Sequence, residues 1–246
     1  MPNDPSLSEQ ATFYDERWAR DANEDRLNGY QLARAAAIFD ALSFLDLNFT
    51  IRKMEPFDIC DFGCGRGWIA AQLAAIGRVT GVDLSPHGVA IAEKRWPHIR
   101  FECADILEYS AREPFDLLVS SEVIEHILEK DRFVAAVARN LKRGGFAIIT
   151  TPNARARRAW ELDGQLSQPI EEWPSLSELR DLFVKDFEIL SHKTFVQQYT
   201  YRGIHRVLSA PKLIKFLRQI RLLEAYEGLE RTIGIGLHQV LVARRR

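Results

Sequence analysis

The sequence lacks any apolar run approaching the roughly 18 residues that a membrane-spanning helix needs. Its first residues, MPNDPSLSE, also lack the charged and then apolar pattern of a secretory signal. Internal repeats and low-complexity tracts are absent as well. We therefore expect a soluble, cytoplasmic protein with a packed core.

Cysteine is scarce, and neither sign of charge is in excess. The three cysteines, Cys60, Cys64 and Cys103, lie in or beside predicted core strands, so we expect buried, reduced thiols and neither a disulfide nor a zinc site. With 33 basic and 34 acidic residues, the chain has no bulk attraction to nucleic acid. What is present, 46% hydrophobic residues in a chain of 246, is enough to bury the core of one domain with an appendage.

Strands and helices are predicted to alternate from residue 57 onward. The predicted strands cover Phe57–Phe62, Arg78–Asp83, Ile99–Cys103, Phe115–Ser120 and Phe146–Thr151. The predicted helices between them cover Trp68–Ile76, Ser85–Arg95 and Lys130–Leu141, the last stopping at Gly144-Gly145. Alternation of this kind predicts an α/β fold with a mostly parallel sheet and helices on both faces.

Two helices are predicted ahead of this core. Phe13, Tyr14 and Trp18 share one face of a helix, and we expect that face to pack on the core. The apolar residues of Tyr30–Leu45 suit a second helix lying against the sheet. We expect residues 1–52 to form a helical cover over the functional site.

Beyond the alternating core, a helix and two strands are predicted around a long insertion. Ser175 and Glu178 form the capping box of a helix over Ser175–Leu182. Phe187–Phe195 and Leu237–Ala243 read as strands that pair antiparallel. The domain organisation we expect is therefore a core of residues 53–196 with 235–246, and an insertion of residues 197–234.

A glycine-rich turn after the first predicted strand is the most informative stretch of the chain. The sequence DFGCGRG holds Gly63, Gly65 and Gly67, and Asp83 ends the next strand about 20 residues later, as in a nucleotide-binding βαβ unit. A dinucleotide site has a further glycine where this chain has Trp68, because helix and pyrophosphate approach each other there. The turn therefore departs from the dinucleotide pattern.

Three acids at successive strand ends favour a cationic nucleoside without phosphate. Asp61 stands just ahead of the turn, where it opposes a pyrophosphate and suits an ammonium group. Asp83 is placed for the two hydroxyls of a ribose. Asp105 is placed to accept from an adenine amine while Ile106 donates from its backbone, although an acid at such a position also caps turns.

The segments DFGCGRG, VDLS, ADIL, SSEVIEHI, LKRGG and ITTPN resemble class I S-adenosylmethionine-dependent methyltransferases in order and spacing. The match covers about residues 30–153 and, more loosely, the last two strands. The resemblance implies a Rossmann-like sheet of seven strands, mostly parallel with an antiparallel last strand, and S-adenosylmethionine as cofactor. It also implies a set of cofactor-binding residues: Asp61, Gly63, Gly65, Asp83, Leu84, Asp105, Ile106 and Ser121.

SSEVIEHI places Glu122, Glu125 and His126 at i, i+3 and i+4, on one face of a helix expected over residues 122–128. Two carboxylates and an imidazole suit a hard divalent cation or an acceptor hydroxyl. The chain resembles quinone-biosynthesis O-methyltransferases, the nearest in motif, and small-RNA 3′-terminal methyltransferases here, and in both groups the triplet is associated with metal. Metal-free relatives carry it too, and residues 169–174 lack the further histidine of the RNA-type site.

We therefore predict His126 and Glu122 as catalytic or acceptor-positioning residues and no bound metal, with Glu122, Glu125 and His126 as the ligands if a metal is used. Methyl transfer asks for in-line positioning and removal of the acceptor proton, so a single base suffices for a phenol or an alcohol.

The insertion is basic on one side. Residues 197–223 contain no acid, and from Pro211 the pattern is helical, with apolar residues on one side and cations on the other. A helix of this kind suits a lid over the acceptor crevice, a contact between subunits or a peripheral contact with an anionic membrane.

The sequence thus predicts an S-adenosylmethionine-dependent methyltransferase that acts on a small molecule at oxygen, with a glycan or lipid-linked acceptor suggested by the insertion. A metal-assisted O-methyltransferase of a quinone pathway is the alternative within enzymes. Two other classes stay open, a nucleic-acid methyltransferase and a non-catalytic partner protein that binds S-adenosylmethionine. Near-neutral charge speaks against nucleic acid, whereas the local basic tract speaks for it.

Overall fold

The computed structural model describes residues 5–20, 28–49, 51, 57–156, 168–195, 211–220, 222 and 236–246. Most of the predicted insertion, including Arg202 and Arg206, lies outside the described residues, as does the stretch around Trp160.

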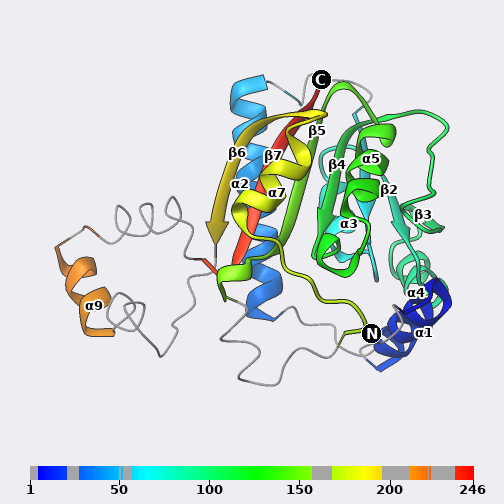
Figure 1. Cartoon of the computed structure of the whole chain (residues 1–246), viewed down its shortest axis with the longest axis horizontal. Coiled ribbons are helices and arrows are strands. Elements are labelled where there is room, and N and C mark those ends of the chain that lie inside the picture. The colour runs from blue at the N-terminus through cyan, green and yellow to red at the C-terminus, as the bar shows by residue number, and fades with distance from the viewer. Residues whose placement is uncertain are drawn as a thin grey trace.

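A sheet of seven strands forms the centre of the described part of the chain (Figure 1). Its order is β3-β2-β1-β4-β5-β7-β6. Strands β1 to β5 run parallel, while β7 is antiparallel to both of its neighbours, β5 and β6. This confirms the predicted mostly parallel α/β sheet with an antiparallel last strand. The strands are β1 (Asp58–Phe62), β2 (Arg78–Asp83), β3 (Arg100–Cys103), β4 (Phe115–Ser121), β5 (Leu141–Pro152), β6 (Phe187–Phe195) and β7 (His238–Arg245).

Helices cover both faces of the sheet (Figure 1). On one face, α2, α3 and α4 bury Leu45, Leu73 and Ala92 against the strands. On the other, α5 and α7 bury Phe133 and Phe183. The described helices are α1 (Leu7–Arg20), α2 (Gly29–Phe49), α3 (Trp68–Leu73), α4 (Pro86–Arg95), α5 (Lys130–Asn140), α7 (Leu176–Phe183) and α9 (Pro211–Gln219), with short 3-10 helices at Ile124–His126 and Ala154–Ala156.

Local sequence signals fix the starts of two helices. Ser85 caps α4 by accepting a hydrogen bond from the backbone N–H of Gly88 at 3.0 Å, and Pro86 follows as the first helical residue. Ser175 and Glu178 form the predicted capping box at the start of α7. Both helix starts are confirmed as the sequence predicts them.

Helix α5 ends within one residue of its predicted end at Leu141, but the expected termination at Gly144-Gly145 is wrong. The helix ends at Asn140, whose side chain donates to the carbonyls of Ala136 and Tyr109 and accepts from the N–H of Ala111. The chain leaves the helix at this residue and continues directly into β5, so Gly144-Gly145 lies within the strand. Gly144 takes a φ of +78°, and the register with β4 shifts in this region, as in a β-bulge.

One cysteine also departs from the prediction. Cys60 and Cys64 are buried free thiols, but Cys103 is exposed. It ends β3, which is an edge strand of the sheet and leaves that position open to solvent. Within the described residues, none of the helices combines the length and the apolarity that crossing a membrane requires.

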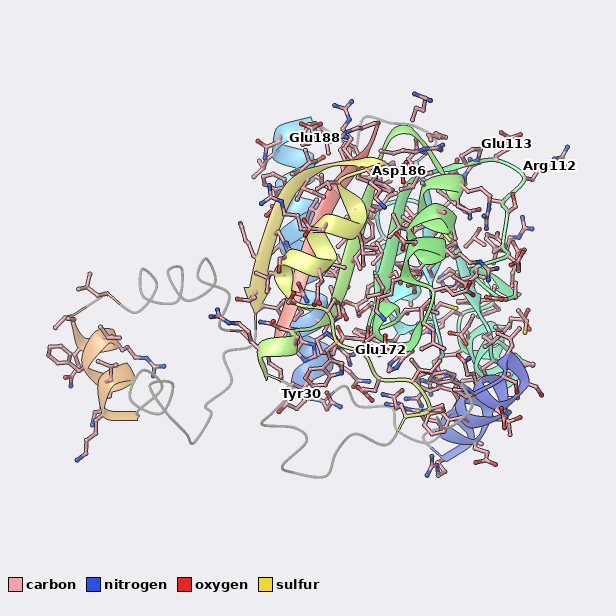
Figure 2. The ribbon with its side chains drawn as sticks, viewed as in Figure 1. Tyr30, Arg112, Glu113, Glu172, Asp186 and Glu188 are labelled. Atoms are coloured by element: carbon pink, nitrogen blue, oxygen red, sulfur yellow. The ribbon has the colours of Figure 1, made fainter. Side chains whose placement is uncertain are left out.

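The parallel strands end at one end of the molecule, where α1 and Tyr30 lie (Figure 2). Arg112, Glu113, Asp186 and Glu188 lie at the opposite end (Figure 2). In an open α/β sheet, ligands bind outside the carboxyl ends of the strands.

Candidate active site

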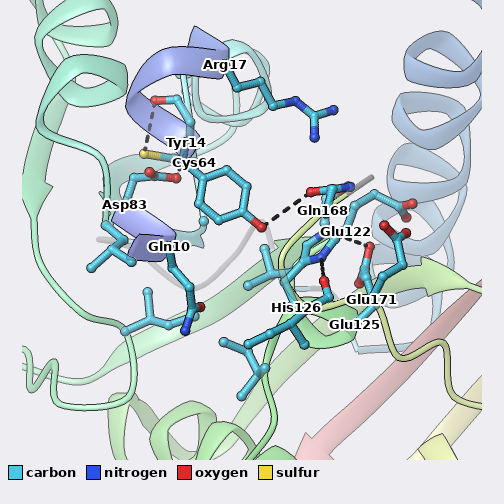
Figure 3. A pocket seen from close by; sticks show the side chains of 18 of the residues that line it. Gln10, Tyr14, Arg17, Cys64, Asp83, Glu122, Glu125, His126, Gln168 and Glu171 are labelled. Carbon is cyan, nitrogen blue, oxygen red and sulfur yellow. Dashed lines mark hydrogen bonds and ion pairs between the residues drawn. The ribbon is translucent and has the colours of Figure 1, made fainter. Parts of the chain in front are cut away.

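A cavity of about 810 Å³ lies at the carboxyl ends of β1, β2 and β4, within the size range of small-molecule sites. Asp83 and Cys64 stand on one side of it, and Glu122, Glu125 and Glu171 stand on the other (Figure 3). The structure brings every predicted site residue to this one cavity: Asp61, Gly63, Gly65, Asp83, Leu84, Asp105, Ile106, Ser121, Glu122, Glu125 and His126.

The turn after β1 admits only glycine at two of its positions. Gly63 has a φ of +75°, and a Cβ there would stand 2.3 Å from Cγ2 of Val123. Gly65 has a φ of +51°, and a Cβ there would stand 2.8 Å from the ring of Trp18. Positive φ and contacts this short both exclude a side chain, so the bare backbone of the turn forms one wall of the cavity.

Asp83 holds the glycine turn to the start of α4. Its carboxylate accepts hydrogen bonds from the N–H of Gly65 at 2.7 Å and from the N–H of Ser85 at 2.9 Å. Burial raises the pKa of Asp83, while these backbone donors act to lower it. The side chain thus presents a carboxylate of fixed orientation to the cavity, with lone pairs left for hydroxyl donors.

Asp61 is a buried acid of the cavity, and one of its carboxylate oxygens lacks a hydrogen-bond donor in the part of the chain that the structure describes. It is 1% exposed, and its Oδ2 has no hydrogen-bond partner among the described residues. Burial raises its pKa from 3.8 to about 7, although the backbone N–H of Ala70 opposes this. A buried carboxylate oxygen without a donor is a ready site for a cation.

Asp61→Asn is expected to change how stability depends on pH. Because the pKa of Asp61 is raised in the folded state, protonated Asp61 favours the fold at low pH, and that contribution is lost as the pH rises toward 7. Between about pH 5 and about pH 8, the unfolding free energy of the wild type should fall relative to Asp61→Asn by roughly 1–3 kcal/mol. Urea unfolding at both pH values measures the difference. Asp58→Asn, on the same strand but paired with Arg78 outside the cavity, should follow the wild type; equal slopes in all three proteins would contradict the assignment.

Asp105 serves a local structural purpose as well as lining the cavity. Its Oδ1 accepts from the N–H of Leu107 at 2.9 Å, which caps the turn after β3. The neighbouring Ile106 is buried, and Leu84 follows β2 at the same wall. Asp105 therefore caps the turn with Oδ1, and its second carboxylate oxygen, Oδ2, is not used by this hydrogen bond.

Glu122 does not begin a helix, contrary to the prediction over residues 122–128. It has a φ of +59°, the only positive φ outside glycine among the described residues, and only Ile124–His126 is helical, as one 3-10 turn. Its Oε2 lies 2.9 Å from Nδ1 of His238, and its Oε1 accepts from Oγ1 of Thr150 at 3.1 Å. Because Thr150 donates its hydroxyl proton to Glu122, its Oγ1 acts as the acceptor for the hydroxyl of Ser121, at 2.9 Å.

The three side chains suggested as possible metal ligands face different partners. Glu122 faces His238, whereas Glu125 accepts from Oγ1 of Thr151 at 2.8 Å. His126 places Nδ1 2.8 Å from the carbonyl oxygen of Ile170. In the part of the chain that the structure describes, no group of three metal-ligating side chains converges, because the left-handed turn at Glu122 removes the i, i+3, i+4 helical face.

The electrostatics of these groups differ sharply. Burial and the charge of Glu122 raise the pKa of Glu125 well above its usual range. Burial alone would also raise the pKa of Glu122, but His238, Arg34 and Thr150 lower it overall. Burial lowers the pKa of His126, against the opposing effect of the Ile170 carbonyl. The cavity therefore holds an ionised Glu122 beside a Glu125 that favours its protonated form.

The first helix lines the cavity with Tyr14 and Trp18, contrary to the prediction that its aromatic face packs on the core. No residue of α1 is buried, and Trp18 rests on the backbone of Gly65 and Gly88. Asp15 accepts from the hydroxyl of Ser85 and, at 3.1 Å, from the N–H of His87, which fixes α1 to α4. The glycines offer a flat surface to the indole ring, which explains the location of the helix.

Several cavity residues are not predicted as site residues from the sequence. Tyr14 points its hydroxyl toward Gln168 at 3.4 Å, and its ring stands edge-on to His126 at 6.1 Å (Figure 3). Arg34 from α2 and His238 from β7 both reach Glu122. These residues come from distant parts of the chain, so only the tertiary fold brings them together.

Comparison with known sequences gives a consistent set of relatives. Residues 59–145 match a protein family described as "Methyltransferase domain". The ubiquinone biosynthesis O-methyltransferase of Rickettsia canadensis is 32% identical over 165 residues, covering 62% of this chain and 70% of that protein. The protein of that name from Rickettsia conorii is 31% identical over 170 residues, covering 65% and 58%. The chain spans about half the length of the first curated relatives it matches, from 40% to 58%.

Solved structures share the fold over the whole chain. The magnesium protoporphyrin IX methyltransferase of Synechocystis PCC 6803, solved with bound S-adenosylmethionine, aligns with a TM-score of 0.65 and covers 100% of both chains. The identity is 13%, so this likeness concerns the fold alone.

Proposed function

Since the chain belongs to the class I S-adenosylmethionine-dependent methyltransferase family, we propose that it transfers the methyl group of S-adenosylmethionine to a hydroxyl oxygen of a small-molecule acceptor. The observation that carries the proposal is the buried oxygen of Asp61 that lacks a donor, in a cavity whose opposite side holds Glu122 and His126. A cationic methyl donor would pair with Asp61 in one half of the cavity, and a hydroxyl of the acceptor would bind near Glu122 and His126 in the other half.

The residues on the donor side fit this cofactor. The ammonium group of the methionine portion would lie by Asp61 and the bare backbone of Gly63 and Gly65. A pyrophosphate in the same place would be repelled by the carboxylate of Asp61. Asp83 would accept from the ribose hydroxyls, and Asp105 from the adenine amine. Leu84, Ile106 and Ser121 would complete the walls.

The acceptor side supplies positioning and a proton acceptor. When bound, the cofactor supplies a methyl group on a sulfonium, which is already a strong electrophile. What this chain adds is a fixed orientation for the acceptor, a base for its proton and exclusion of water. The similarity to ubiquinone biosynthesis O-methyltransferases supports oxygen as the acceptor atom.

Calorimetry with S-adenosylmethionine, S-adenosylhomocysteine and NADH tests the cofactor. We expect the first two to bind and the third to fail, since Asp61 opposes a pyrophosphate. Screening phenols and alcohols for release of S-adenosylhomocysteine then tests the reaction. Binding without release for any acceptor would favour the non-catalytic binding protein, and binding of NADH alone would overturn the proposal.

We further propose a peripheral contact of α9 with an anionic membrane surface. In orange in Figure 1, this helix lies apart from the sheet, with Phe216 54% exposed and Ile220, just beyond it, 44% exposed. Lys212, Lys215 and Arg218 are exposed on the same helix. We expect cosedimentation with phosphatidylglycerol vesicles that weakens by several-fold when Phe216→Ser is introduced; absence of wild-type binding at both low and moderate salt would contradict it.

A further inference from the structure

His238 and Glu122 form a buried pair that the sequence does not reveal. Nδ1 of His238 lies 2.9 Å from Oε2 of Glu122, in the geometry of an ion pair rather than of an aligned hydrogen bond. Both residues line the cavity, one from the start of β7 and one from the turn after β4. Glu122 has a φ of +59°, and in this conformation its carboxylate faces His238.

The carboxylate of Glu122 is held in place from three directions. Besides His238, Oγ1 of Thr150 donates to Oε1, and the guanidinium of Arg34 lies 3.8 Å from Oε2. Thr150 is itself fixed by the hydroxyl of Ser121. An ionised carboxylate only accepts, so Nδ1, the nitrogen of His238 that faces it, carries a proton, and Nε2 is the nitrogen left to take up another.

The imidazole ring is fixed between two aromatic rings. Phe195 stacks on it at 5.5 Å with an interplanar angle of 23°, and Tyr30 lies tilted at 6.2 Å. Within the described part of the chain, Nε2 has no hydrogen-bond or ion-pair partner. A histidine with one nitrogen on a carboxylate, a fixed ring plane and the other nitrogen open is arranged as a general base.

His126 is arranged differently. Its Nδ1 is bound to the carbonyl of Ile170, and its Nε2 faces Oε1 of Glu125 at 3.7 Å. Glu125 favours its protonated form, so the group beside Nε2 of His126 is a neutral carboxylic acid. A neutral acid does not stabilise the positive charge that His126 would carry after taking up a proton. His126 therefore suits the positioning of the acceptor better than removal of its proton.

We propose that His238, oriented by Glu122, is the base that removes the hydroxyl proton of the acceptor. This inference rests on the proposed function. The O–H bond of the acceptor breaks and its proton passes to Nε2 of His238, giving an imidazolium paired with Glu122. The oxygen keeps the bonding pair and uses it to take the methyl group, the pair of the broken C–S bond stays on sulfur, and the imidazolium later releases its proton to water.

Nitrogen-resolved NMR of the histidine rings tests the orientation without any acceptor. In the wild type we expect His238, assigned by its loss in His238→Gln, as the neutral Nδ1–H tautomer. Glu122→Gln should abolish that preference, whereas Glu172→Gln, which removes an acid paired with Lys130 outside the cavity, should not. An Nε2–H tautomer in the wild type, or no effect of Glu122→Gln, would overturn the inference.

Turnover supplies the second readout, with 4-nitrocatechol as the acceptor probe and S-adenosylhomocysteine release as the signal. We expect His238→Gln to lose at least about 100-fold in turnover, the usual worth of a general base, and added imidazole to restore part of it in His238→Ala. His192→Gln, a histidine of β6 that faces Gln239, should keep wild-type turnover. Wild-type turnover in His238→Gln would overturn the assignment, and if the wild type leaves the probe unmethylated, the tautomer alone decides it.

Calorimetry separates this inference from the proposed function. His238→Gln should bind S-adenosylmethionine within about threefold of the wild type, because His238 lies on the acceptor side. Failure of the wild type to bind would remove the proposed function, whereas binding together with undiminished turnover in His238→Gln would remove only the role of His238.

Discussion

Asp83→Asn is expected to weaken S-adenosylmethionine binding by at least about 100-fold, or roughly 2.7 kcal/mol. The carboxylate faces two backbone donors and, as proposed, two ribose hydroxyls, and each charge-assisted hydrogen bond contributes about 1.5–3 kcal/mol. An asparagine keeps the size of the side chain but turns an NH₂ group toward Gly65 or Ser85. One backbone donor then loses its acceptor, and the ribose site loses its charge.

Calorimetric titration of the variant with S-adenosylmethionine measures this effect. Asp58→Asn is the matched control, because it removes an acid from the start of β1, where the partner is Arg78 and not the cavity. That control should bind as the wild type does. Affinity of Asp83→Asn within threefold of the wild type would show that Asp83 serves the turn alone and not the ligand.

Gly63→Ala is expected to lower the free energy of unfolding by about 2–5 kcal/mol. The methyl group would stand 2.3 Å from Cγ2 of the partly buried Val123, and overpacking of this kind costs about 1–3 kcal/mol. A φ of +75° adds about 1–2 kcal/mol for any residue with a Cβ. Urea unfolding monitored by circular dichroism measures the sum.

Two variants separate the clash from the backbone strain. Gly144→Ala has a similar φ of +78°, but its Cβ would meet only Arg244 at 3.5 Å, so it should show the strain alone. The double variant Gly63→Ala with Val123→Ala should recover part of the loss, since it removes the clashing methyl. Equal destabilisation by Gly63→Ala and Gly144→Ala would show that the contact with Val123 relaxes freely.

The half of the cavity that holds Asp61 and Asp83 could be predicted, because its sequence signals are local and its geometry follows from the strand ends. The parallel strands carry Asp61, the last residue but one of β1, and Asp83, the last residue of β2, to one edge of the sheet. The glycine turn needs a bare backbone, and glycine is the residue that supplies it. Such constraints act within a few residues of each other, so they are visible without a structure.

The acceptor half could not be predicted in the same way. The helix expected over residues 122–128 rests on the spacing of Glu122, Glu125 and His126, but the chain turns left-handed at Glu122 instead. The reason lies 116 positions later in the chain, where His238 begins β7, together with Arg34 on α2 and Thr150 on β5. A periodic pattern carries no information about partners that distant.

The sequence by itself determined the alternation of strands and helices, the capped helix starts at Ser85 and Ser175, and the glycine and acid positions of the donor site, because each depends on neighbouring residues or on the period of a buried strand. The tertiary structure alone decided that Trp18 covers the glycine turn, that Asp61 keeps an oxygen without a donor, and that His238 meets Glu122. These depend on which segments pack together, and packing is settled by the whole sheet rather than by any one stretch of the chain.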